Sequence, residues 1–307
     1  MSKSSSSSLP PLALIAGPTA SGKSALAFSL AERTGGMIVN ADASQVYADL
    51  QILSARPTPG EMAGIEHRLF GHVDGGIAYS AAAWAADARA AIGESHAAGR
   101  LPILVGGTGL YIHTLLEGIA PVPEIDPDIR GEVRALATDT AWQALLREDP
   151  AAAALLKPAD RSRIARALEV IRSSGRSILD WRTERQGGIA RGVRLLPLIL
   201  DPPREQLYAR CDARFETMMA AGAEEEVARL IARGLDPALP VMRAIGVPPL
   251  IALLEGRITR AEAVAVAQQA TRNYAKRQQT WLRNQVDPNW PRKEQVISDN
   301  FLRYFEI

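Results

Sequence analysis

A glycine-rich segment near the start of the chain has the residues and spacing of a phosphate-binding loop. The run Gly17-Pro-Thr-Ala-Ser-Gly-Lys-Ser24 satisfies the pattern G-x-x-x-x-G-K-[ST]. In such a P-loop, backbone N–H groups surround a phosphate, and the N-terminus of the next helix adds its positive dipole. The Lys23 ammonium can neutralise terminal phosphate oxygens, and the Ser24 hydroxyl can bind Mg²⁺. The residues expected to bind phosphate are Gly17, Pro18, Thr19, Ala20, Ser21, Gly22, Lys23 and Ser24.

The position of the nearest acid distinguishes this chain from ordinary ATP-binding P-loop enzymes. Nucleoside triphosphatases and kinases with a P-loop usually place an acid directly after a buried strand, where it holds Mg²⁺. Here the apolar run 103–105 leads straight into Gly106-Gly-Thr-Gly-Leu-Tyr111, which contains no acid. The nearest candidate is Asp42, which follows another apolar run at 37–39. The pattern therefore disfavours phosphoryl transfer and directs attention to Asp42.

The elements that must position these residues alternate between strands and helices. Apolar runs at 12–16, 37–39, 103–105 and 193–200 are typical of buried parallel strands, whereas 24–34 and 80–98 have helical periodicity. Such alternation produces a parallel sheet that binds ligands at the carboxyl ends of its strands. We therefore predict an α/β fold, a P-loop NTPase-like parallel sheet flanked by helices.

This alternation is interrupted after Pro121, where only helical patterns follow until strand character returns at Val193. We therefore predict a helical insertion domain at 122–191 and a P-loop core domain formed by 9–121 and 192–307. The polar serine repeat at 1–8 contains no hydrophobic stretch, so we expect a disordered tail there and no signal peptide.

Composition restricts the classes of function. The chain has 307 residues, is 47% hydrophobic and carries a formal net charge of +1, which fits a globular protein without a generally basic surface. The single cysteine, Cys211, excludes an internal disulfide and a Cys-rich zinc site. No run approaches the roughly 18 apolar residues of a membrane span. We expect a cytoplasmic monomer that does not bind membranes.

Further short motifs follow the P-loop in a definite order. These motifs are Ala41-Asp42-x-x-Gln45-Val-Tyr47, Ser54-Ala-Arg-Pro57, Val105-Gly-Gly-Thr-Gly-Leu-Tyr111, Arg163-Ile-x-Arg166-Ala-Leu-Glu-Val170, Arg214-Phe215, Met242-Arg-Ala-Ile-Gly246 and Tyr274-Ala-Lys-Arg-Gln278 with Thr280-Trp-Leu-Arg283. In residue type and order they resemble the bacterial tRNA dimethylallyltransferases, over about Leu12 to Arg283. The zinc finger of the eukaryotic relatives is absent, as the lone cysteine requires.

This resemblance implies a reaction. The enzyme would transfer the dimethylallyl group of dimethylallyl diphosphate to the exocyclic amine of the tRNA adenosine 3′-adjacent to the anticodon, releasing diphosphate. The P-loop would bind the diphosphate, with Mg²⁺ bridging its oxygens and Ser24 as a metal ligand. Lys23 and Arg214 would neutralise the departing diphosphate. Asp42 would take the proton of the amine, and Thr108 would hold the base or the leaving oxygen. The implied catalytic residues are Asp42, Thr108 and Arg214.

The resemblance also implies which residues touch RNA. An adenine stacked in an anticodon loop must be flipped out before its amine can react. The residues expected to contact tRNA are Asp42, Ala43, Ser44, Gln45, Arg130, Ser162, Arg163, Arg166 and Arg243. The chain departs from the family pattern at Ala43-Ser44, which replaces Ser-Met, at Ser162 and Ala165, which replace glutamines, and at Val247, which replaces tyrosine.

Structural roles are an alternative for several of these residues. Asp42 could cap a helix, and Thr108 could belong only to a turn. The arginines at 161, 163 and 166 could form a solvated helix face, as could the cations at 272, 276, 277 and 283.

Three other functions remain open from the residues alone. The first is a P-loop kinase of a small metabolite, and the second is a prenyltransferase acting on free adenine nucleotides. The third is a nucleotide-gated RNA-binding module without catalysis, which would bind tRNA independently of Asp42.

Overall fold

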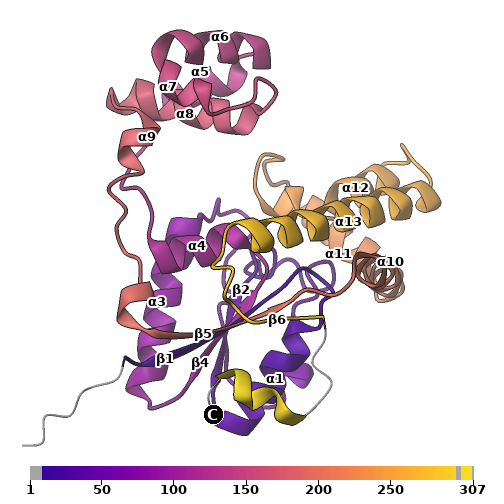
Figure 1. The fold of residues 1–307 in the computed structure, drawn as a ribbon. Helices are drawn as coiled ribbons and strands as arrows, with labels where there is room; N and C mark the ends of the chain where they lie inside the picture. Colours follow the sequence, from indigo (N-terminus) through magenta and orange to yellow (C-terminus); the bar gives the residue numbers. More distant parts are fainter. Residues whose placement is uncertain (1–8, 295–298, 306–307) are drawn as a thin grey trace, which may run out of the picture. The chain divides into compact units, whose positions relative to one another are not determined.

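The chain divides into two compact units, Met1–Leu115 with Ala190–Ile307 and the intervening Leu116–Ile189. They are seen in a computed structural model that describes residues 9–294 and 299–305 (Figure 1). The tail predicted at 1–8 lies outside the described residues. Across the described ranges, no helix has both the length and the apolar character that crossing a membrane requires.

The first unit is built on a parallel six-stranded sheet of order β3-β2-β4-β1-β5-β6. The predicted strands are present as β1 (Pro11–Ala16), β2 (Met37–Ala41), β4 (Pro102–Gly106) and β5 (Arg194–Leu200). The edge strands β3 (His67–Arg68) and β6 (Arg292–Lys293) were not predicted, because two residues are too short to show a hydrophobic period. The predicted P-loop NTPase-like parallel sheet is thus confirmed.

Helix α1 (Lys23–Thr34) covers one face of this sheet. Its buried side chains Leu26, Ala27, Leu30 and Ala31 join a cluster with alternate residues of β1 and β4, as expected when successive strand residues face opposite ways. The helix ends at Gly35, whose φ of 65° lies in the left-handed region that glycine adopts without strain. Phe301 and Phe305 of η3 (Asp299–Phe305) pack against the same cluster.

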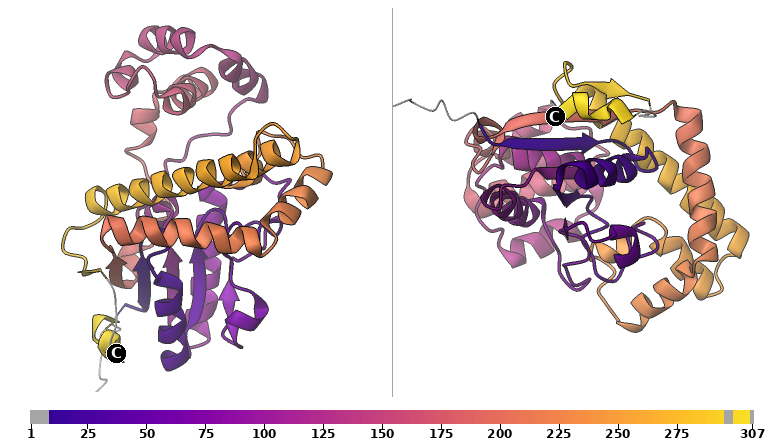
Figure 2. Two further views of the ribbon diagram at one scale, coloured as in Figure 1. Left: turned by 90° about the vertical axis from the view of Figure 1, so that its right-hand side faces the viewer. Right: turned by 90° about the horizontal axis from the view of Figure 1, so that it is seen from below.

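Two long helices cross the carboxyl ends of the strands. Figure 2 shows α10 (Arg204–Ala220) and α13 (Arg260–Asn284) side by side in this position. Helix α13 begins with a capping box, in which the Thr259 hydroxyl accepts the Glu262 N–H and the Glu262 carboxylate accepts the Thr259 N–H. The remaining elements of this unit are α2 (Pro59–Met62), α3 (Ala81–Ala97), α4 (Gly109–Glu117, which runs into the second unit), η1 (Ala190–Gly192), α11 (Ala223–Ala232), η2 (Val241–Arg243) and α12 (Val247–Leu254).

The second unit is helical and has a core of its own. It contains α5 (Pro127–Ala135), α6 (Thr138–Glu148), α7 (Pro150–Ala154), α8 (Arg161–Ser174) and α9 (Ile178–Trp181). Leu145, Ile164 and Leu168 are fully buried in that core. The unit begins before the predicted boundary at 122, because Ile119 and Gln186 exchange two backbone hydrogen bonds of 3.0 Å that join its ends.

Candidate active site

A pocket lies at the carboxyl ends of the central strands, below α10 and α13. The P-loop contributes Thr19, and the segment after β2 contributes Asp42 and Ser44. Its cavity volume is about 40 Å³. The other lining residues are Leu50, Leu53, Ser54, Cys211, Arg214, Phe215, Met218, Ala244, Ile245, Thr271 and Tyr274.

The P-loop has the backbone conformation of an anion-binding turn. Gly22, with a φ of 91°, is the residue that precedes α1. Because glycine has no side chain, Gly22 cannot accept a hydrogen bond from the first N–H groups of the helix. A side chain at Gly17 would bring a Cβ within 2.8 Å of the Leu200 carbonyl oxygen, which explains the first glycine of the motif. The buried Ser21 hydroxyl has no hydrogen-bond partner among the described residues. The loop therefore has a left-handed glycine before the helix and a buried hydroxyl without a hydrogen-bond partner.

Two cations and one acid meet beside this loop. Burial lowers the pKa of Lys23 from 10.5 to about 8, the Asp42 carboxylate opposes that shift, and the Arg214 cation adds to it. Burial also lowers the pKa of Arg214, whose Nη2 donates a hydrogen bond to Thr19 Oγ1. Because both side chains lose solvation here, a bound anion would stabilise their charged forms strongly. The site is suited to a ligand with several negative charges.

The segment after β2 holds Asp42 in a fixed turn. The Asp42 N–H donates to Asn40 Oδ1 at 2.9 Å, and the Ser44 N–H donates to Asp42 Oδ1 at 2.9 Å. The next residue is fixed as well, since the Ala43 N–H donates to Thr108 Oγ1 at 3.0 Å. Oδ2 of Asp42 has no hydrogen-bond partner within the described part of the chain, so it is available to a ligand.

Helix α13 contributes two side chains, Tyr274 and Gln278, that belong to a motif of the sequence but were not predicted as site residues. The Tyr274 hydroxyl contacts Thr108 and Gln278, and burial together with the Asp42 charge raises its pKa. Gln278 is buried, and its Oε1 accepts the Thr19 N–H at 2.7 Å. Their spacing of four residues places both on one helix face, which is the signal that could have identified them.

The glycines after β4 allow α13 to approach this closely. A Cβ at Gly107 would lie 2.3 Å from Gln278 Nε2, and a Cβ at Gly109 would lie 2.2 Å from the Trp281 ring. Both distances are far shorter than any ordinary contact. The glycine loop therefore serves helix packing, while Thr108 between these glycines bonds to the Asp42 segment.

The structure brings some of the predicted residues together and leaves others apart. Thr19, Asp42, Ser44 and Arg214 line the pocket, whereas Ser24 lines a separate cavity of about 280 Å³. The Gln45 amide is bound to the carbonyl oxygens of residues 54 and 55. The side chain of Arg243 is exposed, and its neighbours at 244 and 245 line the pocket instead.

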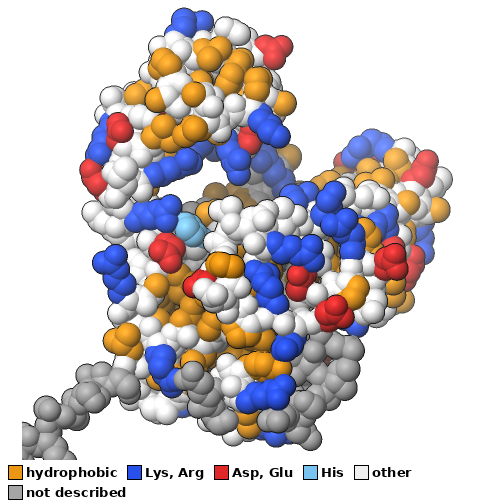
Figure 3. Space-filling view, in the orientation of Figure 1, with side chains coloured by type: hydrophobic (Ala, Val, Ile, Leu, Met, Phe, Trp, Pro, Cys, Tyr) orange, Lys and Arg blue, Asp and Glu red, His pale blue; other side chains and the backbone are white. Residues whose placement is uncertain are grey.

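The remaining predicted tRNA-contacting residues belong to the helical unit. Ser162, Arg163 and Arg166 are exposed on α8, and Arg130 is exposed on α5. The pKa of Arg166 is lowered, mainly because part of its side chain is buried and also because the cations Arg130 and Arg134 lie nearby. The buried Glu169 carboxylate acts in the opposite direction and raises this pKa. These cations therefore lie close together, and Figure 3 shows several Lys and Arg side chains on the visible face of this unit.

Comparison with known families gives a match over most of the chain. The model of a family described as IPP transferase matches residues 45–285. The matched range starts after the P-loop and Asp42 and includes Thr108, Arg214 and Gln278.

Individual proteins give matches that extend to nearly the whole length. A tRNA dimethylallyltransferase of Sphingopyxis alaskensis is 63% identical over 288 residues, which are 94% of each chain. The full-length tRNA isopentenylpyrophosphate transferase of Bacillus halodurans has 32% identity and a TM-score of 0.69, covering 96% of this chain and 93% of its own. A eukaryotic dimethylallyltransferase acting on tRNA has 27% identity and a TM-score of 0.78, covering 91% of this chain and 71% of its own.

Proposed function

Because the chain belongs to the IPP transferase family, we propose that it transfers a dimethylallyl group from dimethylallyl diphosphate to a tRNA adenosine. It is a prenyltransferase that modifies tRNA. The proposed acceptor is the exocyclic amine of the adenosine 3′-adjacent to the anticodon, and the second product is diphosphate. We further propose that the protein acts on tRNA in the cytoplasm and as a monomer.

The donor half of the site consists of the P-loop, Lys23 and Arg214. When the allylic C–O bond breaks, the electron pair leaves with the diphosphate and negative charge increases on its oxygens. Lys23 and Arg214 are already in place, so their stabilisation of this charge requires little reorganisation. The Arg214 contact to Thr19 is one that a phosphate oxygen of the donor can replace.

Mg²⁺ fits this half as a partner of the donor phosphates. No group of three or more His, Cys, Asp and Glu side chains within the described ranges is arranged to hold a metal ion. Mg²⁺ commonly takes only one or two protein ligands and completes its shell with phosphate oxygens and water. The exposed Ser24 hydroxyl in the first turn of α1 is an oxygen ligand of the right kind. Bound there, the ion would supply further positive charge to the diphosphate.

The acceptor half centres on Asp42. The exocyclic amine of adenine is a weak nucleophile because its lone pair is delocalised into the ring. As the new C–N bond forms, the nitrogen must lose a proton, and Asp42 Oδ2 is the available acceptor. Thr108 Oγ1 holds the Ala43 N–H and so positions the backbone next to this carboxylate.

One observation carries the proposal: Asp42 and the cations Lys23 and Arg214 meet at a P-loop where β4 ends in glycine. In phosphoryl transfer the strand would supply a metal-binding acid. We propose instead that the acid here takes a proton and that the cations receive a leaving diphosphate.

The test is incubation with labelled dimethylallyl diphosphate and Mg²⁺, with either unmodified tRNA or AMP as acceptor. The products are digested and identified by mass spectrometry. We expect prenylated adenosine beside the anticodon from tRNA and none from AMP. Prenylated AMP would assign the protein to nucleotide prenylation, and ATP turnover without transfer would favour the kinase.

A further inference from the structure

Glu226 is a buried carboxylate outside the pocket, and it binds three consecutive backbone amides. It lies in the first turn of α11 with 3% of its surface exposed. Its Oε1 accepts the N–H groups of Gln51 at 2.7 Å and Ile52 at 2.8 Å, and its Oε2 accepts the Leu53 N–H at 2.9 Å. These contacts join residues more than 170 positions apart in the chain.

These amides form an anion-binding turn that the protein fills with its own side chain. Successive N–H groups converging on one point make a concave site for an anion. The Arg56 guanidinium adds an attractive interaction with the Glu226 charge and donates to the carbonyl oxygens of residues 48 and 50. A buried carboxylate with this many donors is fully satisfied, so it fixes the turn in one conformation.

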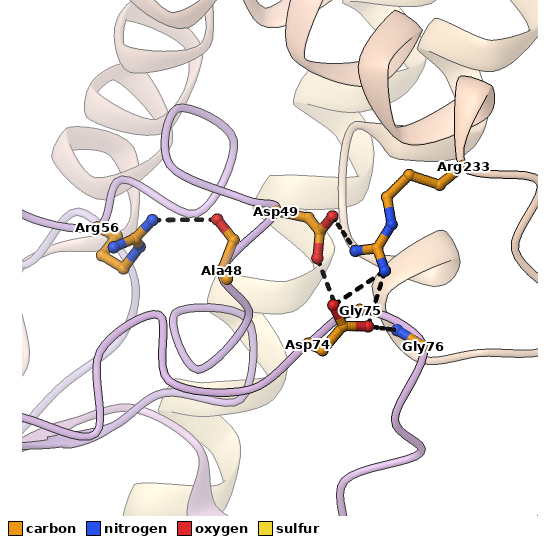
Figure 4. A network of polar contacts seen from close by, with 7 residues as sticks. All are labelled: Ala48, Asp49, Arg56, Asp74, Gly75, Gly76 and Arg233. Carbon is orange, nitrogen blue, oxygen red and sulfur yellow. Dashed lines mark hydrogen bonds and ion pairs between the residues drawn. The ribbon is translucent and has the colours of Figure 1, made fainter.

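A second contact from the end of α11 fixes the same segment. Figure 4 shows Arg233, the residue after the helix, between Asp49 and Asp74. Its Nη1 donates to Asp49 Oδ1, and its Nη2 lies 2.8 and 2.9 Å from the two oxygens of Asp74. Asp49 Oδ2 also accepts the Gly75 N–H at 2.8 Å. Residues 49–53 are therefore held from both ends of helix α11, by Glu226 in its first turn and by Arg233 after its last residue.

The segment held by α11 leads directly to Asp42. Leu53 and Ser54 line the pocket. The Gln45 amide donates to the carbonyl oxygens of residues 54 and 55, at 3.1 and 2.9 Å. Next to Gln45, the Ser44 N–H is bonded to Asp42 Oδ1. Hydrogen bonds, linked by the backbone at residues 53–54 and 44–45, thus connect Glu226 with the carboxylate proposed to take the proton.

We infer that Glu226 is a positioning residue for the acceptor half of the active site. This inference rests on the proposed function, in which Asp42 meets the adenine. The donor half is held by other elements, since Thr19 contacts Arg214 of α10 and Gln278 of α13. Loss of the Glu226 charge should therefore disturb the reaction with tRNA and leave diphosphate binding intact.

The neighbouring Glu225 supplies a matched control. It lies in the same turn of α11 but is exposed, so Glu225→Gln removes the same charge near the same helix N-terminus without touching residues 51–53. If Glu226 merely favoured the helix dipole, the two substitutions would behave alike.

The experiment compares Glu226→Gln and Glu225→Gln in the full chain, with steady-state kinetics on tRNA and calorimetric binding of pyrophosphate. For Glu226→Gln we expect kcat/KM for tRNA to fall about tenfold to a hundredfold, since small misplacements of reacting groups have effects of that size. The pyrophosphate Kd should stay within about twofold of the unaltered protein, and Glu226→Asp should recover part of the loss. Glu225→Gln should change neither quantity.

Unaltered tRNA kinetics in Glu226→Gln would overturn the inference, and so would an equal loss of pyrophosphate binding, because a global disturbance affects both halves. Should Glu226→Gln fail to fold, Arg233→Gln at the exposed end of α11 tests the same selectivity.

Hydrogen exchange at residues 44–56 separates this inference from the proposed function. Faster exchange there in Glu226→Gln supports positioning even in a protein that does not prenylate tRNA, and unchanged exchange refutes it.

Discussion

The Oε1 atom of Gln278 accepts a hydrogen bond of 2.7 Å from the backbone N–H of Thr19. One amide of the P-loop is therefore occupied by a side chain of α13. The same threonine receives a hydrogen bond from Arg214 of α10 through its hydroxyl. Both late helices thus fix the loop at a single residue, so the conformation of the phosphate site depends on segments more than 190 residues away.

This contact predicts the effect of Gln278→Leu. The Thr19 N–H would lose its acceptor, and a buried unsatisfied donor costs about 1–3 kcal/mol of stability. The P-loop would rearrange to satisfy it, so we expect a KM for dimethylallyl diphosphate several-fold higher, with a smaller change for tRNA. Steady-state kinetics and thermal unfolding measure both effects. Gln269→Leu, at an exposed position of the same helix, should change neither.

Asp42→Asn tests the proposed base while preserving the turn. Asparagine keeps an Oδ1 that accepts the Ser44 N–H, so the segment should hold its conformation. The amide cannot take a proton from the adenine amine, and loss of general-base catalysis typically lowers the rate about 10²- to 10⁴-fold.

Single-turnover assays with bound tRNA should show this decrease, and pyrophosphate and tRNA affinities should remain near those of the unaltered protein. Turnover that survives the substitution would remove Asp42 from the chemistry. Asp87→Asn, at an acid outside the pocket, serves as the control.

Much of this architecture could be predicted from the sequence because its signals are local. The long strands are apolar runs, α1 ends at Gly35-Gly36, and the P-loop is a contiguous motif. The two edge strands could not be predicted, because each is a pairing of two residues set by tertiary contacts.

The site was partly predictable for the same reason. Asp42 could be proposed because it directly follows a strand, and it lines the pocket. The contacts of Gln278 with Thr19 and of Glu226 with residues 51–53, by contrast, join distant parts of the chain. No local pattern distinguishes Glu226 from the acidic residues before it in the same helix turn. Only its burial does, and burial depends on the assembled fold.

Lys23 predicts a dependence on pH with a definite sign. Its pKa in the folded protein is about 8, below the ordinary 10.5, so the ammonium is charged below about pH 8 and neutral above it. Pyrophosphate affinity should therefore weaken as pH rises through about 8. Calorimetry at several pH values measures this change in pyrophosphate affinity. Any pH dependence of the affinity that remains in Lys23→Met comes from the titration of pyrophosphate itself or of other groups.

The same shift has the opposite consequence for stability. Between about pH 8 and 10.5 the unfolded chain binds more protons than the folded one, so stability contributed by Lys23 rises with pH across that window. At neutral pH the charge of this partly buried ammonium is unfavourable, because it has lost solvation. Lys23→Met should accordingly raise the Tm of the ligand-free protein near pH 7, with a gain that shrinks toward pH 10. A lower Tm near pH 7 would contradict the proposed burial cost.

Arg214 and Thr19 should be energetically coupled. Arg214→Gln removes a cation that faces the leaving diphosphate, and such losses lower kcat about 10²- to 10³-fold. Thr19→Val removes only the hydroxyl that accepts the Arg214 hydrogen bond. If that contact aligns the guanidinium, the double variant will be little worse than Arg214→Gln alone. Independent, multiplicative effects on kcat in a double-mutant cycle would show that the contact has no catalytic role.

The helical unit offers a test of RNA contact on a single helix. Arg166 of α8 lies 3.8 Å from the buried Glu169 and beside Arg130, so part of its charge is available to a phosphate. Arg172 of the same helix is held by both oxygens of Glu148, at 2.7 and 2.8 Å.

Arg166→Gln should weaken tRNA binding several-fold. It should also reduce the slope of log K against log salt by about 0.7 to 1, the value for one lost phosphate contact. Arg172→Gln should leave that slope unchanged. Equal slopes in the two variants, measured by filter binding over a range of salt concentrations, would remove Arg166 from the RNA interface.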